Sequence, residues 1–267
     1  MSGHTLDREL LAFVGHHART VHRGFSYPPE SLVASVKVCP VCCGPMTAEY
    51  ALCYQCHDRR STFHDQLADI VVPVSYAVRG NSALQQFYTD LHQYKADRPS
   101  AAAQNRLKAL LLLFRLHHLE CLEQHVGLPV QAVIPVPSGK NRVKHPLPDI
   151  ASMLTAPMGD LRGYPLLSAR FVGQPRTSRV QRTNPDDFAI DQRLAGHVVI
   201  VEDTWVQGHN AQSLAIQAKR RGASKVSIVV LARMLDYAYP PTKTMVDTWP
   251  SDAHFDPHVC PMRGTSH

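Results

Sequence analysis

The stretch that decides the fold runs from His197 to Gly222 and reads HVVIVEDTWVQGHNAQSLAIQAKRRG. Residues 198–201 are β-branched without polar alternation, which is typical of a strand buried on both faces of a parallel sheet. Two acids, Glu202 and Asp203, come next, and a turn then leads into a helical pattern that ends at Gly222. This order predicts a strand–turn–helix unit of an α/β fold.

The turn between the acids and the helix has the features of a phosphate site. Thr204 to Gly208 contains the polar residues Thr204 and Gln207 and ends in glycine, and the helix is expected to start near Asn210. Backbone N–H groups of such a turn and of a helix start can bind a phosphate, while the two acids can accept hydrogen bonds from ribose hydroxyls. Because many α/β proteins end a strand with an acid, an ordinary strand-to-helix connection is the alternative.

These residues resemble the phosphoribosyl-pyrophosphate motif of type I phosphoribosyltransferases, in which a hydrophobic strand runs into two acids and a threonine-glycine loop. Gln207 stands where the family usually has Thr or Ser. The resemblance implies that the acids hold the ribose 2- and 3-hydroxyls and that the turn holds the 5-phosphate. The phosphoribosyl-binding residues would be Glu202, Asp203, Thr204, Trp205, Val206, Gln207, Gly208 and His209.

Two Cys-x-x-Cys pairs near the N-terminus, Cys39/Cys42 and Cys53/Cys56, predict a metal site. Each pair can make a tight turn, and two such turns on facing hairpins would give a tetrahedral thiolate site for Zn²⁺. A ribbon this short has almost no core without metal. The alternative is a set of reduced thiols, and Cys43 is expected to be spare.

The rest of the chain alternates between strand and helix patterns. Strands are expected at 70–78, 132–138 and 225–232, and helices at 82–94, 100–122 and 148–158; residues 161–171 read as strand and turn. This alternation predicts a parallel sheet flanked by helices. The expected parts are a helical leader (1–35), a zinc ribbon (36–62), an α/β domain (70–238) and a tail (239–267).

Four cations are candidates for binding a diphosphate. The strand at 132–138 runs into Lys140 and Arg142, and the polar segment 174–188 contains Arg179 and Arg182. Solvated basic turns would have the same composition, so both interpretations stay open.

The order of motifs along the chain resembles that of the ComF family. It consists of a zinc ribbon, a strand–turn–helix unit, the strand ending at Ser138 with Lys140 and Arg142 behind it, and the phosphoribosyl motif. Residues 36–235 can be laid along that family, which is associated with competence and often labelled amidophosphoribosyltransferase-like. The segment His145–Pro148 replaces the family's usual arginine-glycine-phenylalanine-asparagine. The resemblance implies a type I phosphoribosyltransferase fold, phosphoribosyl diphosphate bound with Mg²⁺, and a loop at 174–188 that closes over the diphosphate.

Two functions remain open at this point. One is transfer of a phosphoribosyl group to an unknown acceptor, with catalysis by positioning and charge stabilisation because no general base stands out. The other is a non-catalytic, zinc-containing module in DNA uptake or processing that binds a nucleotide, single-stranded DNA or a partner protein. The net charge of +6 and the pI near 9.0 favour a polyanionic ligand.

The composition places the chain among globular proteins. It contains no run of about 18 apolar residues, so no membrane span is expected, and without a signal-peptide core it is expected to be cytoplasmic. In the tail, His254, His258 and Cys260 could bind a second metal, contact the ribbon, or remain unordered.

Overall fold

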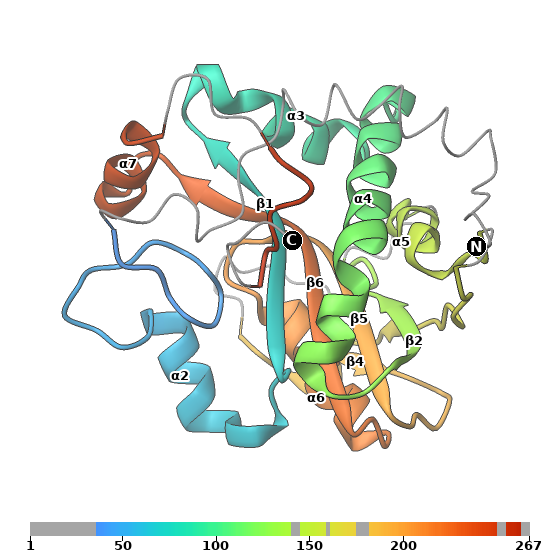
Figure 1. The fold of residues 1–267 in the computed structure, drawn as a ribbon. Coiled ribbons are helices and arrows are strands. Elements are labelled where there is room, and N and C mark those ends of the chain that lie inside the picture. The colour runs from blue at the N-terminus through green and yellow to red at the C-terminus, as the bar shows by residue number, and fades with distance from the viewer. Residues whose placement is uncertain (1–35, 140–144, 159–160, 175–181, 250–254, 263–267) are drawn as a thin grey trace.

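The structure, a computed structural model, describes residues 36–139, 145–158, 161–174, 182–249 and 255–262. At its centre is a four-stranded parallel sheet in the order β1-β6-β5-β2 (Figure 1). The strands are β1 (Ile70–Arg79), β2 (Val130–Pro135), β5 (His197–Trp205) and β6 (Lys225–Asp236). The predicted α/β fold with a parallel sheet is confirmed, whereas the predicted helical leader lies outside the described residues.

The β-branched run of β5 is buried because both faces of the sheet are covered. Val199 and Val201 pack into a core on one face, and Val198 and Ile200 pack into a second core on the other. The side-chain period of two thus divides one apolar run between two layers.

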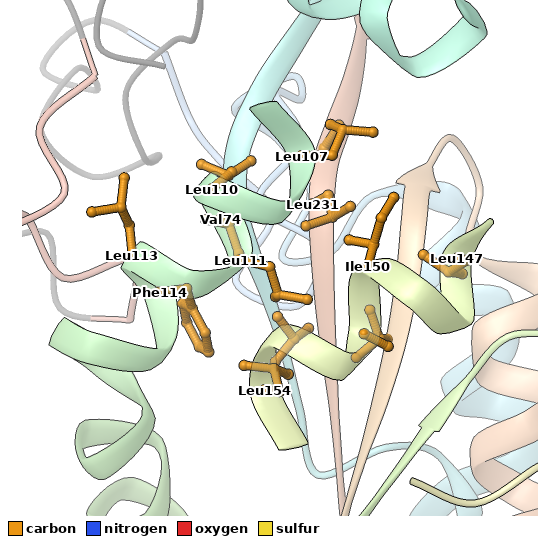
Figure 2. Close-up of a cluster of buried hydrophobic side chains, with 14 of the residues drawn as sticks. Val74, Leu107, Leu110, Leu111, Leu113, Phe114, Leu147, Ile150, Leu154 and Leu231 are labelled. Atoms are coloured by element: carbon orange, nitrogen blue, oxygen red, sulfur yellow. The ribbon is translucent and has the colours of Figure 1, made fainter. Parts of the chain in front are cut away.

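Three helices cover the first face: α3 (Gln85–Gln93), α4 (Ala101–Val126) and α5 (Leu147–Thr155). In Figure 2, side chains of α4 and α5 meet over Val74 of β1 and Leu231 of β6. The start and end of α4 follow from local chemistry, since the Ser100 hydroxyl accepts a hydrogen bond from the Ala103 N–H and Gly127 adopts the left-handed conformation.

The second face is covered by α6 (His209–Arg220) and by the cysteine-rich segment with its helix α2 (Tyr54–Phe63). Helix α6 connects the neighbouring parallel strands β5 and β6. Cys39, Cys42 and Cys56 belong to the same buried cluster as Leu214 of α6. The cysteine-rich segment therefore shares its core with the sheet.

Smaller elements complete the described chain, and two of them correct the predictions. Only Arg170–Phe171 (β3) is a strand in the 161–171 region; it pairs with β4 (Phe188–Ala189). The tail contains an unpredicted helix, α7 (Pro240–Asp247), whose prolines occupy the first turn, where a missing N–H costs nothing. The remaining elements are the 3₁₀ turns η2 (His64–Gln66), η3 (Ser82–Leu84) and η4 (Pro185–Asp187).

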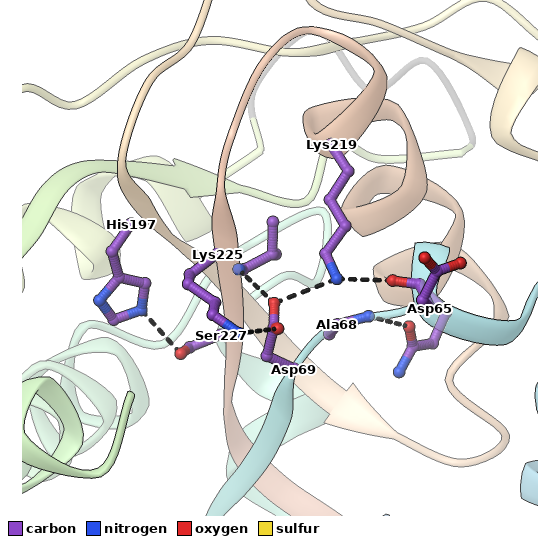
Figure 3. A network of polar contacts seen from close by, with 9 residues as sticks. Asp65, Ala68, Asp69, His197, Lys219, Lys225 and Ser227 are labelled. Carbon is purple, nitrogen blue, oxygen red and sulfur yellow. Dashed lines mark hydrogen bonds and ion pairs between the residues drawn. The ribbon is translucent and has the colours of Figure 1, made fainter. Parts of the chain in front are cut away.

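A polar network around Asp69 fixes the register at the start of β1 (Figure 3). The Asp69 carboxylate accepts hydrogen bonds from the Val226 N–H at 2.8 Å and from Lys225 Nζ at 2.9 Å, and Lys219 Nζ lies 3.1 Å away. Burial raises the pKa of Asp69, but the N–H group and the lysines outweigh burial, so the pKa lies below its ordinary value. One carboxylate thus joins β1, β6 and α6.

We expect Asp69→Asn to lower the free energy of unfolding by about 1–2 kcal/mol at neutral pH, because charge-assisted hydrogen bonds are lost. A carboxylate with a depressed pKa contributes stability above its unfolded pKa near 3.8 and loses it as the pH falls through the folded value. The deficit of the variant should therefore shrink below about pH 3.8. Urea unfolding at a series of pH values measures this.

Asp186→Asn is the control, since the Arg220–Asp186 pair is exposed and should be worth less than about 0.5 kcal/mol. Equal effects of the two substitutions at neutral pH would show that the Asp69 network does not stabilise the sheet.

Candidate functional site

The candidate site lies where β5 passes into α6. Strand β5 continues through Trp205, beyond the predicted strand at 198–201 and into the first two residues of the predicted turn, because its last residues still pair with β6. The turn is therefore shorter than predicted, and α6 begins at His209. Glu202 and Asp203 stand near the carboxyl end of β5, the edge at which open parallel sheets bind ligands.

Gly208 is required at this turn for two separate reasons. Its φ of 78° lies in the left-handed region that glycine tolerates best. A Cβ at this position would lie 2.2 Å from Cζ2 of the buried Trp205 ring. The turn at Gly208 therefore packs directly against the Trp205 ring at the end of β5.

Asp203 is held by two side chains from the end of α3. Its Oδ2 accepts a hydrogen bond from Lys95 Nζ at 2.6 Å and another from the Tyr94 hydroxyl. Burial raises the pKa of Asp203, but Lys95 and Tyr94 outweigh burial, and the pKa lies below its ordinary value. Asp203 is therefore an ionised carboxylate in a nearly buried ion pair.

Glu202 differs from its neighbour in the direction of its pKa shift. Burial, reinforced by the negative charge of Asp203, raises the pKa of Glu202 well above its ordinary value. Its Oε1 accepts a hydrogen bond from the Asp203 N–H at 3.2 Å. The Asp203 carboxylate can only accept hydrogen bonds. The neighbouring Glu202 carboxyl group holds its proton more tightly and can then donate a hydrogen bond as well, so the pair suits a ligand with two hydroxyls.

A pocket of about 600 Å³ opens beside this acid pair, a volume typical of small-molecule sites. It extends from β5 and the α6 start to the carboxyl ends of β1 and β6 and to α3. The polar side chains around it include both signs of charge, so it suits a ligand with hydroxyl and anionic groups. The pocket is lined by residues of the motif and by side chains that contact the motif: Glu202, Asp203, Thr204, Val206, Gln207, Asn210, Lys95 and Arg233.

Of the four predicted cations, only Arg182 lies in the described residues. Lys140, Arg142 and Arg179 lie outside the part of the chain that the structure describes. Arg182 is exposed and does not line the pocket. The end of the predicted loop does reach α6, since the Thr183 hydroxyl lies 3.2 Å from Nδ1 of the buried His209.

The four predicted metal ligands do lie together. The sulfurs of Cys39, Cys42, Cys53 and Cys56 are all within 4.8 Å of one another and could hold a metal ion. Hydrogen bonds among the thiols, led by that with Cys42, lower the pKa of Cys39, and hydrogen bonds led by that with Cys39 raise the pKa of Cys56. Four thiols at this spacing cannot all ionise without a compensating cation.

The prediction of two facing hairpins is wrong for the second pair. The first pair lies on a turn closed by the Cys39 N–H donating to the Gly44 carbonyl and by a bridge between Val38 and Pro45. Cys53 instead caps α2, and Cys56 lies in the first turn of that helix. A helix start satisfies the same spacing, because its first N–H groups also point toward a thiolate.

Two arginines, the buried Arg59 and the partly buried Arg233, connect this cluster to the β5–α6 turn. Arg59 of α2 donates to the Gln207 carbonyl, and its guanidinium lies 5.9 Å from the Trp205 ring centroid. Arg233 of β6 donates to the carbonyls of Cys42 at 3.1 Å, Trp205 at 3.0 Å and Val206 at 3.2 Å. Sequence reasoning missed both roles because each is a single arginine outside any recognisable pattern.

A scan against protein-family models gives no match, and a search of curated proteins finds no similar sequence. Within the described segments, no helix combines the length and the apolar composition that crossing a bilayer requires.

We expect Gly208→Ala to lower the free energy of unfolding by about 2–4 kcal/mol, because it adds both backbone strain and a clash with Trp205. The change should also shift the tryptophan fluorescence, since Trp205 must move. Gly127→Ala is the matched control: its φ is also positive, at 77°, but no atom lies within 4 Å of the added Cβ. Chemical denaturation should find about 1–2 kcal/mol for the control, and equal losses in the two variants would contradict the packing argument.

Proposed function

We propose that this chain is a phosphoribosyltransferase-like protein of the ComF type that binds phosphoribosyl diphosphate or a nucleotide. The observation that carries the proposal is that one pocket borders the acid pair and the β5–α6 turn. The 5-phosphate would lie against backbone N–H groups between Thr204 and His209, where the helix dipole favours an anion. The ribose hydroxyls would lie against Glu202 and Asp203, and Mg²⁺ would accompany the diphosphate.

Both members of the ion pair between Lys95 and Asp203 would have a role in binding the ligand. Asp203 must keep its charge to accept hydrogen bonds from a ribose, and Lys95 keeps it ionised inside a largely buried site. An anionic ligand would in turn attract the Lys95 ammonium, which lines the same pocket. The pocket therefore offers acceptors for hydroxyls and a cation for phosphate within one volume.

A non-catalytic role is the second candidate, and the engagement of Asp203 favours it. Tyr94 and Lys95 already occupy Oδ2 of Asp203. Transfer would also need cations to neutralise the departing diphosphate, and the described Arg182 does not line the pocket. In that case the same site would bind a nucleotide or single-stranded DNA in DNA uptake or processing.

For the Cys39/Cys42/Cys53/Cys56 cluster we propose structural Zn²⁺, because four thiolates within reach of one tetrahedral ion are its preferred donor set. Such a site would carry a net charge of about −2. The buried Arg59 guanidinium would offset this charge, as would the partly buried Arg233, whose Nη2 lies 3.9 Å from the Cys42 sulfur.

Calorimetric titration of phosphoribosyl diphosphate with Mg²⁺ into the zinc-loaded protein tests the function. We expect micromolar binding by the wild type and at least about tenfold weaker binding by Asp203→Asn, because a charge-assisted hydrogen bond to the ribose is lost. Asp191→Asn, an exposed acid paired with Arg170, should bind as the wild type does. Thermal unfolding of each variant separates lost binding from lost folding.

Unchanged affinity in a folded Asp203→Asn variant would contradict the ribose role. No binding by the wild type at millimolar ligand would overturn the phosphoribosyl proposal. Titration with a single-stranded DNA at two salt concentrations would then test the second candidate, since phosphate contacts weaken steeply with salt.

Removing Zn²⁺ with a chelator should loosen the turn as well as the cysteine-rich segment, because Arg59 and Arg233 hold both. In hydrogen exchange, we expect faster exchange at 36–63 and at 206–208, with β5 unchanged at 198–201, and reversal when Zn²⁺ is restored. Faster exchange confined to 36–63 would show that the two arginines do not couple the metal cluster to the turn.

A further inference from the structure

Six of the seven cysteines fall into two clusters that could hold a metal. The first is the Cys39/Cys42/Cys53/Cys56 site. The second joins His118 and Cys121 of α4 to Cys260, which follows α7 in the tail, and its ligand atoms all lie within 4.8 Å of one another. None of the seven cysteines, all of which lie in described segments, forms a disulfide.

The second cluster is assembled by the docking of the tail on α4. His118 and Cys121 are three residues apart and therefore lie on one face of the helix. Cys260 reaches that face because the tail segment is anchored by buried apolar residues, Phe255 and Val259. Phe255 is part of the same core as α4 and α5. Residues 139 positions apart are thus brought together in a largely buried place.

The orientation of His118 suits a metal ligand. Its Nε2 lies 2.6 Å from the Pro257 carbonyl oxygen. A carbonyl can only accept, so Nε2 carries the hydrogen and Nδ1 carries the lone pair of the neutral ring. Metal-binding histidines usually donate their second N–H to a backbone carbonyl or carboxylate in this way, which fixes the ring. Here that carbonyl belongs to the tail that also supplies Cys260.

We propose that His118, Cys121 and Cys260 form a second metal site that takes Zn²⁺. Two thiolates and an imidazole are ligands that this ion prefers, and binding would release the two thiol protons to solvent. The fourth position would be filled by water or by a neighbouring imidazole, since the rings of His117 and His258 lie 4.5 Å apart beside the cluster. The metal would tie the tail to α4.

The metal content of the full chain, purified under reducing conditions and loaded with Zn²⁺, tests the proposal. We expect about two Zn²⁺ per wild-type chain after removal of loosely bound metal, and about one in Cys121→Ser and in Cys260→Ser. The control is Cys43→Ser, the cysteine outside both clusters, which should keep about two. Cys39→Ser with Cys42→Ser should lose the first metal and keep the second.

Cobalt substitution gives a readout that does not depend on counting metal in variants. The thiolate-to-cobalt absorption should fall by about one third in Cys121→Ser/Cys260→Ser, because two of the six ligating thiolates are removed. One Zn²⁺ per wild-type chain would overturn the proposal, as would two Zn²⁺ in both single variants. A Cys121–Cys260 disulfide in the reduced, zinc-loaded protein would also overturn it. Circular dichroism establishes that each variant is folded.

Discussion

The guanidinium of Arg233 holds together the parts of this molecule that carry its chemistry. It donates to the Cys42 carbonyl on one side and to the carbonyls of Trp205 and Val206 on the other. The approach is possible because residue 44 is glycine: a Cβ there would lie 2.3 Å from the Arg233 Nη2 atom. The planar guanidinium spreads five donors over three nitrogens, so it can reach carbonyls on two sides at once, whereas the three donors of a lysine all sit on one atom.

The consequence of this contact is that the cysteine cluster and the ligand pocket form one structural unit. Arg59 strengthens the connection from α2, where burial lowers its pKa and the neighbouring cysteines partly restore it. The charge of the buried Arg59 would be costly without a negative partner. A metal–thiolate cluster with net negative charge would be such a partner, so that the charge of the proposed metal site and the position of the turn would depend on each other.

Much of the fold could be predicted from the sequence, because its signals are local. The apolar run 198–201 is typical of a doubly buried strand, which the structure confirms, and Ser100 marks the start of α4, which continues to Val126 beyond the predicted end at Leu122. The helix at Pro240–Asp247 was not predicted, although the first turn of a helix tolerates its prolines. The start of α2 at Cys53 was missed because Cys-x-x-Cys spacing fits a helix start as well as a hairpin.

The candidate site could be predicted only in part, because its backbone motif is local and its partners are not. Glu202, Asp203 and Gly208 follow from one short stretch, whereas Lys95 is 108 positions away from the acid that it pairs with. No sequence pattern indicates a contact between residues so far apart, and a lysine near the end of a helix is usually solvated. The ion pair with Lys95 favours the ionised form of Asp203. The protonation of the two acids therefore could not be predicted without the tertiary structure.

The segments that carry the two cysteine clusters lie beside one edge of the sheet. Strand β1 lies at the edge of the described sheet, and an uncovered edge invites pairing with another chain. The cysteine-rich segment approaches it where the Tyr76 hydroxyl donates to the Cys43 carbonyl at 2.6 Å. The end of the tail, with Pro261 and Met262, borders a pocket together with Ile70 and Val71 at the start of β1. Both segments have few core residues of their own, so a metal in each cluster would be a compact way to hold them over the edge.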